Sequence, residues 1–210
     1  MYKRQIYNIP EARSDGVEVE ATWEPVRELQ FILSYGYNDT EILNSGCVIN
    51  ADGDPTATQV GATPDPNCPV TTAGKPQNLR GNPLPNAPKN KLALNGNYTF
   101  NFDPGSLSLS ATYAWRDVQY GSIFATPYNR APAWDQVDLR ATWTANHGNY
   151  EIVGYVKNLF DSIGYDAASG ANISNQPYGT VPGSTPKYTQ QRTYDITPPR
   201  LVGAEIHYHF

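Results

Sequence analysis

The sequence predicts an all-β protein that folds as an antiparallel transmembrane β-barrel, and three observations lead to this prediction. Aromatic residues make up 12% of the 210 residues, with 15 tyrosines, while charged residues make up 17%. The 17 glycines and 18 prolines gather between runs in which apolar and polar residues alternate. Short and long connections between these runs alternate along the chain. Because Tyr, Thr, Val and Trp favour strands and Gly, Pro, Asn and Asp favour turns, the composition is that of a β protein.

Seven segments alternate with period two, which is the pattern of a strand with one apolar and one polar face. We expect strands near residues 16–24, 29–42, 91–102, 106–120, 135–145, 149–159 and 200–210. In chain order, the apolar face would carry Val17, Val19, Ala21 and Trp23; Leu29, Phe31, Leu33, Tyr35 and Tyr37; Leu92, Leu94, Tyr98, Phe100 and Phe102; Leu107, Leu109, Ala111, Tyr113 and Trp115; Val137, Leu139, Ala141 and Trp143; and, in the last segment, Val202, Ala204, Ile206 and Tyr208. The sixth segment, YEIVGYVKNLF, alternates less regularly.

The lengths of the connections favour a membrane barrel over a soluble domain. Turns of about four residues join the segments in pairs, and the long loops 44–90, 121–133 and 161–199 join the pairs. Short turns at one end and long loops at the other are typical of outer-membrane barrels, as are aromatic residues near the strand ends and a polar inner face. Strands of about 10–12 residues also approach the length of a tilted membrane-spanning strand. A soluble β-sandwich with its polar face outward is the alternative.

Charge and chain ends bear on location and partners. With a net charge of −5 and no basic patch, we expect no nucleic-acid partner. The sequence contains no run of 18 apolar residues, so it predicts no transmembrane helix. The start, MYKRQIYNIPEARSDG, lacks the apolar stretch of a secretory signal, so either the protein is cytosolic or Met1 is not the biological start. Seven strands are an odd number, and a membrane sheet must close, so the chain is expected to be a fragment of a barrel.

Five segments resemble the C-terminal part of the β-barrel of TonB-dependent outer-membrane receptors. They are NIPEARSDGVEVEATWEP (8–25), LSYGYNDTEI (33–42), VDLRATW (137–143), YVKNLFD (155–161) and PPRLVGAEIHYHF (198–210). In that family a plug domain sits inside a 22-stranded barrel, so the resemblance implies that these are the last seven strands, without the plug domain, the TonB-contacting box and the signal peptide. It places the chain in the Gram-negative cell outer membrane as a multi-pass barrel. The implied partners are outer-membrane lipid, the barrel-assembly machinery, the rest of the barrel with its plug, and the TonB complex.

The resemblance also explains why the chain stops on an aromatic residue. In the family the last strand closes the barrel, and its alternating apolar residues with a terminal aromatic form the signal that the barrel-assembly machinery reads. Ile206, Tyr208 and Phe210 occupy those positions. An exposed strand edge with an aromatic anchor is also a natural ligand for β-augmentation. The other interpretation is an ordinary final strand.

Cys47 and Cys68 are the only cysteines, and both fall in the longest loop, which the resemblance makes extracellular. We therefore predict a disulfide between them. A redox or metal pair is less well supported, because there is no CxxC spacing and no nearby histidine. In the chain-entropy model, closing a loop of this size restrains it by about 3 kcal/mol.

Other candidate sites are weak. Asp52, Asp54 and Asp65 lack the spacing and the final glutamate of a calcium loop. His207 and His209, beside Glu205, could chelate a metal but fit wall residues better, so no metal and no cofactor is expected. His147 lies in a turn and carries little information. Repeated acids such as Glu18 and Glu20 do not form a catalytic dyad, and no nucleophile or phosphate-binding motif occurs, so an enzyme is not supported.

The function implied by the resemblance is TonB-energised uptake of a scarce solute such as a ferric siderophore, cobalamin or an oligosaccharide. Loop residues that could contact such a ligand are Tyr128, Tyr165, Tyr178, Tyr188, Arg80, Arg130 and Arg192, and the sequence singles out none of them. Two alternatives remain. One is a soluble extracellular β-sandwich that binds glycans or acts in adhesion, and the other is an outer-membrane barrel enzyme.

Overall fold

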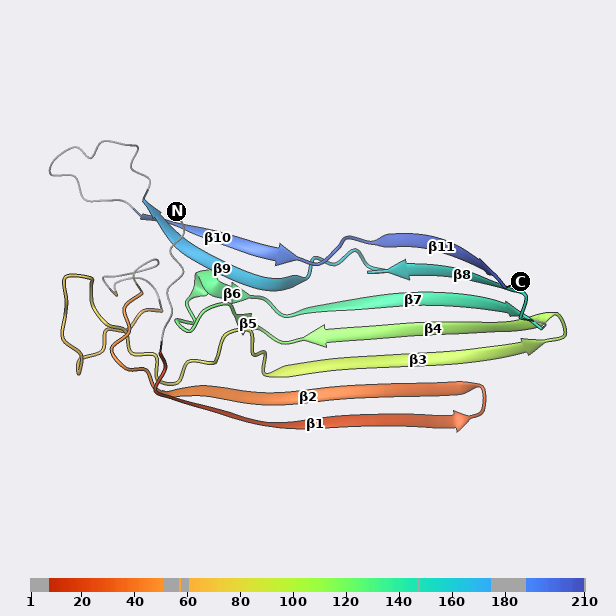
Figure 1. The fold of residues 1–210 in the computed structure, drawn as a ribbon, viewed down its shortest axis with the longest axis horizontal. Coiled ribbons are helices and arrows are strands. Elements are labelled where there is room, and N and C mark those ends of the chain that lie inside the picture. The colour runs from red at the N-terminus through yellow and green to blue at the C-terminus, as the bar shows by residue number, and fades with distance from the viewer. Residues whose placement is uncertain (1–7, 51–56, 58–60, 147, 175–187, 210) are drawn as a thin grey trace.

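The structure is a computed structural model that describes residues 8–50, 57, 61–146, 148–174 and 188–209, with the backbone alone for 170–174 and 188–192. One antiparallel sheet of seven strands dominates it, in the order β1-β2-β3-β4-β7-β8-β11 (Figure 1). Its strands are β1 (Glu11–Val26), β2 (Leu29–Asn44), β3 (Asn90–Phe102), β4 (Gly105–Arg116), β7 (Trp134–Ala145), β8 (Tyr150–Lys157) and β11 (Leu201–Tyr208). Each strand pairs with the next along the chain within this sheet, as expected of an up-and-down barrel wall.

The two ends of the sheet differ. The short connections 27–28, 103–104 and 146–149 lie at one end, which we call the turn end, and the long connections lie at the other, the loop end (Figure 1). At the loop end the chain also forms the short strands β5 (Gln119–Tyr120) and β6 (Arg130–Ala131), the 3₁₀ helix η1 (Pro127–Asn129), and the hairpin of β9 (Tyr165–Ser174) with β10 (Tyr188–Ile196).

The register gives the sheet one apolar and one polar face. Leu33, Leu94, Tyr113 and Val137 form one row across four strands, and Glu20, Ser34, Ala93, Ala114 and Gln136 form a row on the opposite face. Since successive side chains of a strand point to opposite faces, the alternation along each segment becomes a continuous surface across the strands.

Within the described residues the apolar face is not covered by a second sheet. Val17 is 61% exposed, Phe102 50% and Ile206 76%, values that belong to a surface and not to a core. The alternative of a β-sandwich is therefore wrong, because a sandwich buries its apolar faces against each other. The open edges, β1 and β11, make this sheet a part of a barrel and not a closed one.

Aromatic side chains gather on the apolar face near the turn end. Trp23 stacks on Phe31 with 5.7 Å between ring centroids, and Phe102 lies 6.0 Å from Trp143. Tyr208 pairs with Tyr150 across β11 and β8. These rings form a band across the strands, the arrangement that an interfacial girdle requires.

Charged residues replace apolar ones on the same face near the loop end. Lys89 Nζ lies 3.0 Å from Asp39 Oδ1, and Arg13 Nη2 lies 3.2 Å from Glu41 Oε2. The hydrogen bond to Asp39 raises the pKa of Lys89 above its ordinary value. The apolar surface therefore ends near Tyr37, and β1 and β2 continue several residues past it.

The ends of several elements differ from the sequence prediction. The first strand begins at Glu11 and not near residue 16. The sequence did not predict this start because the polar stretch EARSD shows no alternation of apolar and polar residues. The predicted strand 106–120 breaks after Arg116, where the Asp117 carboxylate accepts the backbone N–H of Val118 at 2.7 Å and turns the chain. The loop predicted over 161–199 contains the hairpin β9–β10. Its run YTQQRTYDI has strong β propensity but no two-faced pattern.

Most of the buried apolar residues in the described part of the chain lie at the loop end, and Val153 of β8 is buried within the sheet itself. Ile42, Val48, Leu79 and Phe124 form one cluster, and Ile9, Leu84 and Ile123 pack around it. Over the described part of the chain, no helix is long and apolar enough to cross a membrane.

Candidate functional site

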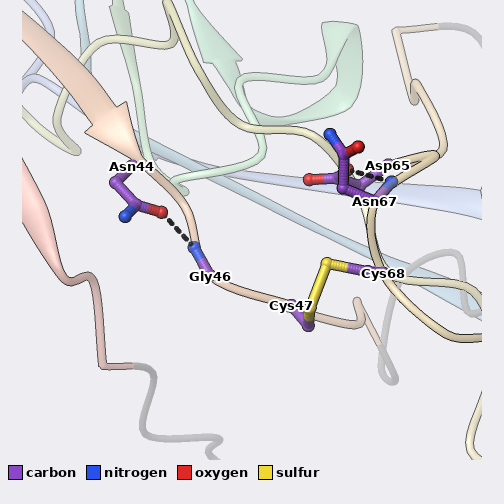
Figure 2. Close-up of a disulfide and its surroundings, with 6 residues drawn as sticks. All are labelled: Asn44, Gly46, Cys47, Asp65, Asn67 and Cys68. Carbon is purple, nitrogen blue, oxygen red and sulfur yellow. Dashed lines mark hydrogen bonds between the residues drawn. A yellow bond between two sulfur atoms is a disulfide. The ribbon is translucent and has the colours of Figure 1, made fainter.

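The disulfide between Cys47 and Cys68 joins two walls of a polar hollow at the loop end. The Cα atoms of the two cysteines lie 5.5 Å apart, within the usual range for a disulfide. Asn44 Oδ1 accepts a hydrogen bond from the N–H of Gly46 at 3.1 Å (Figure 2). Asp65 Oδ1 accepts one from the N–H of Asn67 at 2.9 Å. These local turns fix the backbone on both sides of the disulfide.

Arg80 supplies the positive charge of this hollow, which has a volume of about 430 Å³. Its Nε donates to the carbonyl oxygen of Leu43 at 2.8 Å, and its backbone N–H donates to Asn78 Oδ1 at 3.1 Å. Among the ion pairs of the described residues, none involves Arg80. The guanidinium is thus held in place while it keeps donors for an anionic or polar group.

A second hollow lies on the polar face just below the loop end. It has a volume of about 470 Å³, and its lining includes Glu18, Glu20, Lys91, Arg116 and Trp134. In the ion pairs between described residues, the two glutamates and Lys91 do not take part. Acidic groups from β1 and cationic groups from β3 and β4 therefore line the same hollow.

Arg116 connects this wall to the hairpin above it. Its guanidinium lies over the Trp134 ring, 5.9 Å from the centroid, and Nη2 donates to the carbonyl oxygen of Tyr165 in β9. Gln119 Nε2 donates to the next carbonyl, that of Asp166, at 2.6 Å. Sequence reasoning missed this cluster, because Arg116 and Trp134 are adjacent only through the pairing of β4 with β7.

The buried Asn158 of the KNLFD segment was also missed as a structural residue. It has a positive φ of 52°, and its side chain binds the backbone of Ser162 and Pro198. Its own N–H donates to Asp138 Oδ1 at 2.8 Å. The segment was singled out in the sequence, but only the fold shows which groups it joins.

The residues proposed as an assembly signal lie on β11 at the turn end. Ile206 pairs with Ile152, and Tyr208, which is 59% exposed, pairs with Tyr150. Phe210 lies outside the described residues. The two that are described present their side chains on the apolar face.

The candidate metal ligands do not come together. His207 Nε2 lies 3.2 Å from Glu205 Oε2, and the backbone N–H of His209 donates to the carbonyl of Asn149. In the described part of the chain, no group of three or more His, Cys, Asp or Glu side chains is gathered to hold a metal. Asp52, Asp54 and His147 lie outside that part.

The loop tyrosines and arginines fall into different environments. Tyr128 is only 1% exposed, and its hydroxyl accepts a hydrogen bond from Asn50 Nδ2 at 3.3 Å. Tyr165 packs edge-on against Tyr194 with ring centroids 4.9 Å apart. Arg80 and Arg130 are exposed. Tyr178 is outside the described residues, as are the side chains of Tyr188 and Arg192.

A groove of about 720 Å³ lies on the opposite, apolar face. Small residues of neighbouring strands, Gly96, Ala111, Ala141 and Gly154, form its floor. Its surface is almost entirely apolar.

Comparison with known proteins gives the family. A family model described as TonB dependent receptor-like, beta-barrel matches residues 3–159. No curated protein matches the chain.

Solved structures share the fold. The ferric yersiniabactin uptake receptor FyuA from Yersinia pestis has a TM-score of 0.62 at 16% identity, over 95% of this chain and 24% of that one. The siderophore receptor PiuA from Acinetobacter baumannii has a TM-score of 0.59 at 17% identity, over 93% of this chain and 22% of that one. The ferric preacinetobactin receptor BauA from the same organism has a TM-score of 0.58 at 16% identity, over 94% and 22%.

This chain therefore spans about a quarter of the length of these receptors or slightly less. The family match extends over most of the strands of the seven-stranded sheet, from β1 to β8. The chain belongs to the TonB-dependent receptor-like β-barrel family.

Proposed function

We propose that this chain is part of an outer-membrane receptor that takes up a scarce solute with energy from the TonB complex. The observation that carries the proposal is the family match over residues 3–159. The single-layered sheet with one apolar and one polar face supports it. Such uptake needs binding and passage of the solute, and it requires no catalytic residue in the chain.

We infer that the apolar face contacts the lipid of a Gram-negative outer membrane. From Leu92 to Phe102 the apolar residues of β3 cover roughly 33 Å of strand at about 3.3 Å per residue. A tilt of about 40° projects this onto roughly 25 Å, the height of the apolar band of outer-membrane barrels. The aromatic band at the turn end and the charged residues beyond Tyr37 agree with these two boundaries.

The seven strands are proposed as the last seven of a 22-stranded barrel with a plug domain inside. On this proposal the turn end faces the periplasm, and the connections near 44–90, 121–133 and 161–199 are extracellular. The disulfide Cys47–Cys68 would then lie in the oxidising exterior, where disulfides persist. Ile206, Tyr208 and Phe210 would serve as the signal for the barrel-assembly machinery.

Among the candidate solutes we favour a ferric siderophore over cobalamin or an oligosaccharide. The three solved structures compared above are named as a ferric yersiniabactin uptake receptor, a siderophore receptor and a ferric preacinetobactin receptor. Arg80 at the loop end, and Lys91 and Arg116 on the polar wall, offer cationic groups to the anionic oxygens that commonly bind iron.

Uptake of radioactive iron tests this function. Cells that lack their own siderophore receptors would produce the receptor containing this chain and would be given ferric hydroxamate, catecholate and mixed siderophores. We expect saturable uptake of at least one of them, which disappears in a matched strain without TonB. If no siderophore is taken up while labelled cobalamin or maltodextrin is, the solute class is wrong. Equal uptake in the strain without TonB would contradict the proposal that the TonB complex supplies the energy.

A further inference from the structure

We propose that the three long connections at the loop end form one cooperative unit, so that they open and close together and not as separate flaps. We call this unit the loop cap and define it as the described residues of 44–90, 117–133 and 158–200. The proposal goes beyond the uptake function, since it concerns how the solute-facing loops move.

An apolar cluster joins the first connection to the second. Ile42, Val48 and Leu79 come from β2 and the connection after it, while Phe124 comes from the connection between β4 and β7. All four are less than 9% exposed. Neither connection can bury its share of this cluster without the other.

Polar contacts follow the same seam. Asn82 Nδ2 donates to the carbonyl of Ile123 at 2.9 Å, and the N–H of Asn86 donates to the carbonyl of Tyr120 at 2.8 Å. Asn50 Nδ2 donates to the hydroxyl of the buried Tyr128 at 3.3 Å. Separation of the two connections would break these three hydrogen bonds and would expose Asn50 and Tyr128, which are 6% and 1% exposed.

The second connection packs against β9 through a backbone contact at Gly121. A Cβ atom at Gly121 would overlap the carbonyl oxygen of Ala168. Ala168 is a buried residue, 2% exposed. Beside this contact, the buried side chain of Gln119 donates to the carbonyl of Asp166. The hairpin β9–β10 is therefore seated on the second connection at a distance that only glycine permits.

The cap is fixed to the sheet at two points. Arg116, held over Trp134, binds the carbonyl of Tyr165. At the second point, the N–H of Asn158 donates to Asp138 Oδ1 of β7 at 2.8 Å, and the Asn158 side chain binds the backbone of Ser162 and Pro198, which connects the start and the end of the third connection. Because each connection is held by contacts from another, their openings are coupled into one event.

Hydrogen exchange of the whole receptor in outer-membrane vesicles, without solute, tests the proposal. The variant Gly121→Ala separates the second connection from β9, and Gly154→Ala is the matched control, since a Cβ there meets nothing within 4 Å. If the cap is one unit, Gly121→Ala accelerates exchange on the order of tenfold in 77–86, 119–131 and 165–169 alike, and the control leaves all three unchanged. Faster exchange confined to 119–131 and 165–169 would overturn the proposal.

A second variant removes a bond without a clash, in case Gly121→Ala prevents folding. Gln119→Ala deletes the contact to Asp166 and is expected to raise exchange in the same three segments to a smaller degree. A change limited to the residues next to 119 and 166 would again contradict one unit. Because exchange is measured without solute or transport, this outcome is independent of whether the receptor takes up a siderophore.

Discussion

Asn158 shows how one side chain can organise the loop end. It is 2% exposed, adopts a left-handed backbone conformation, and uses its amide for three hydrogen bonds. Asparagine tolerates positive φ better than other non-glycine residues. The position therefore combines a backbone requirement with a bonding requirement.

Two substitutions at this position separate the requirements. Asn158→Gly keeps the backbone conformation but loses the side-chain bonds, and we expect the free energy of unfolding to fall by about 2–3 kcal/mol. Asn158→Ala also strains the backbone and should cost about 1 kcal/mol more. Thermal and urea unfolding of the receptor in detergent would measure both.

The exposed Asn101 of β3 provides the comparison. Asn101→Ala is expected to change stability by less than about 0.5 kcal/mol. If Asn158→Ala is as stable as this control, Asn158 does not hold the loop end together.

At the scale of elements, the connection between β2 and β3 depends on both its apolar cluster and its disulfide. The cluster includes Val48, next to Cys47, and Leu79, beyond Cys68. In the chain-entropy model, the disulfide stabilises the closed connection by about 3 kcal/mol, because it lowers the conformational entropy of the opened chain.

We predict that replacing both cysteines by serine makes this connection, together with the loop cap, open more often and leaves the sheet intact. Trypsin should then cut after the exposed Arg80 in the variant and much more slowly in the disulfide-bonded receptor. The β-sheet circular dichroism of the two forms should be equal. Equal rates of cleavage would mean that packing alone holds the connection.

At the scale of the whole molecule, the sheet of the described residues ends in two edges, β1 and β11, that pair with no further described strand, and its apolar face is exposed. In lipid every backbone polar group needs a partner, so an open sheet is not stable there by itself. Edges of this kind pair with other strands.

Residues 1–210 produced alone are therefore expected to associate through these edges and to need detergent to stay in solution. Light scattering and heat-dependent mobility in gel electrophoresis would detect this, with the complete receptor as the comparison. A monodisperse monomer in buffer without detergent would show that the apolar face is covered in a way that the sheet does not indicate.

The alternation of residues such as Leu92, Leu94, Tyr98 and Phe100 determined the strands and the two faces, because a period of two is a local property of the chain. The same local reading did not find the start of β1 at Glu11 or the hairpin β9–β10, where no face is apolar. It also left Asn158 and Gly121 without a role, and it gave no sign that Tyr128, one of the loop ligand candidates, is buried.

The sequence by itself thus determined an all-β, two-faced sheet, its short and long connections, and the pairing of the two cysteines as an expectation. Only the tertiary structure decided that the long connections bury their own apolar cluster, that Arg116 lies over Trp134, and that Gly121 contacts Ala168. The reason is physical: strand periodicity is set by neighbours in the chain, whereas these contacts join residues far apart in sequence, and their energy appears only once the sheet has brought the loops together.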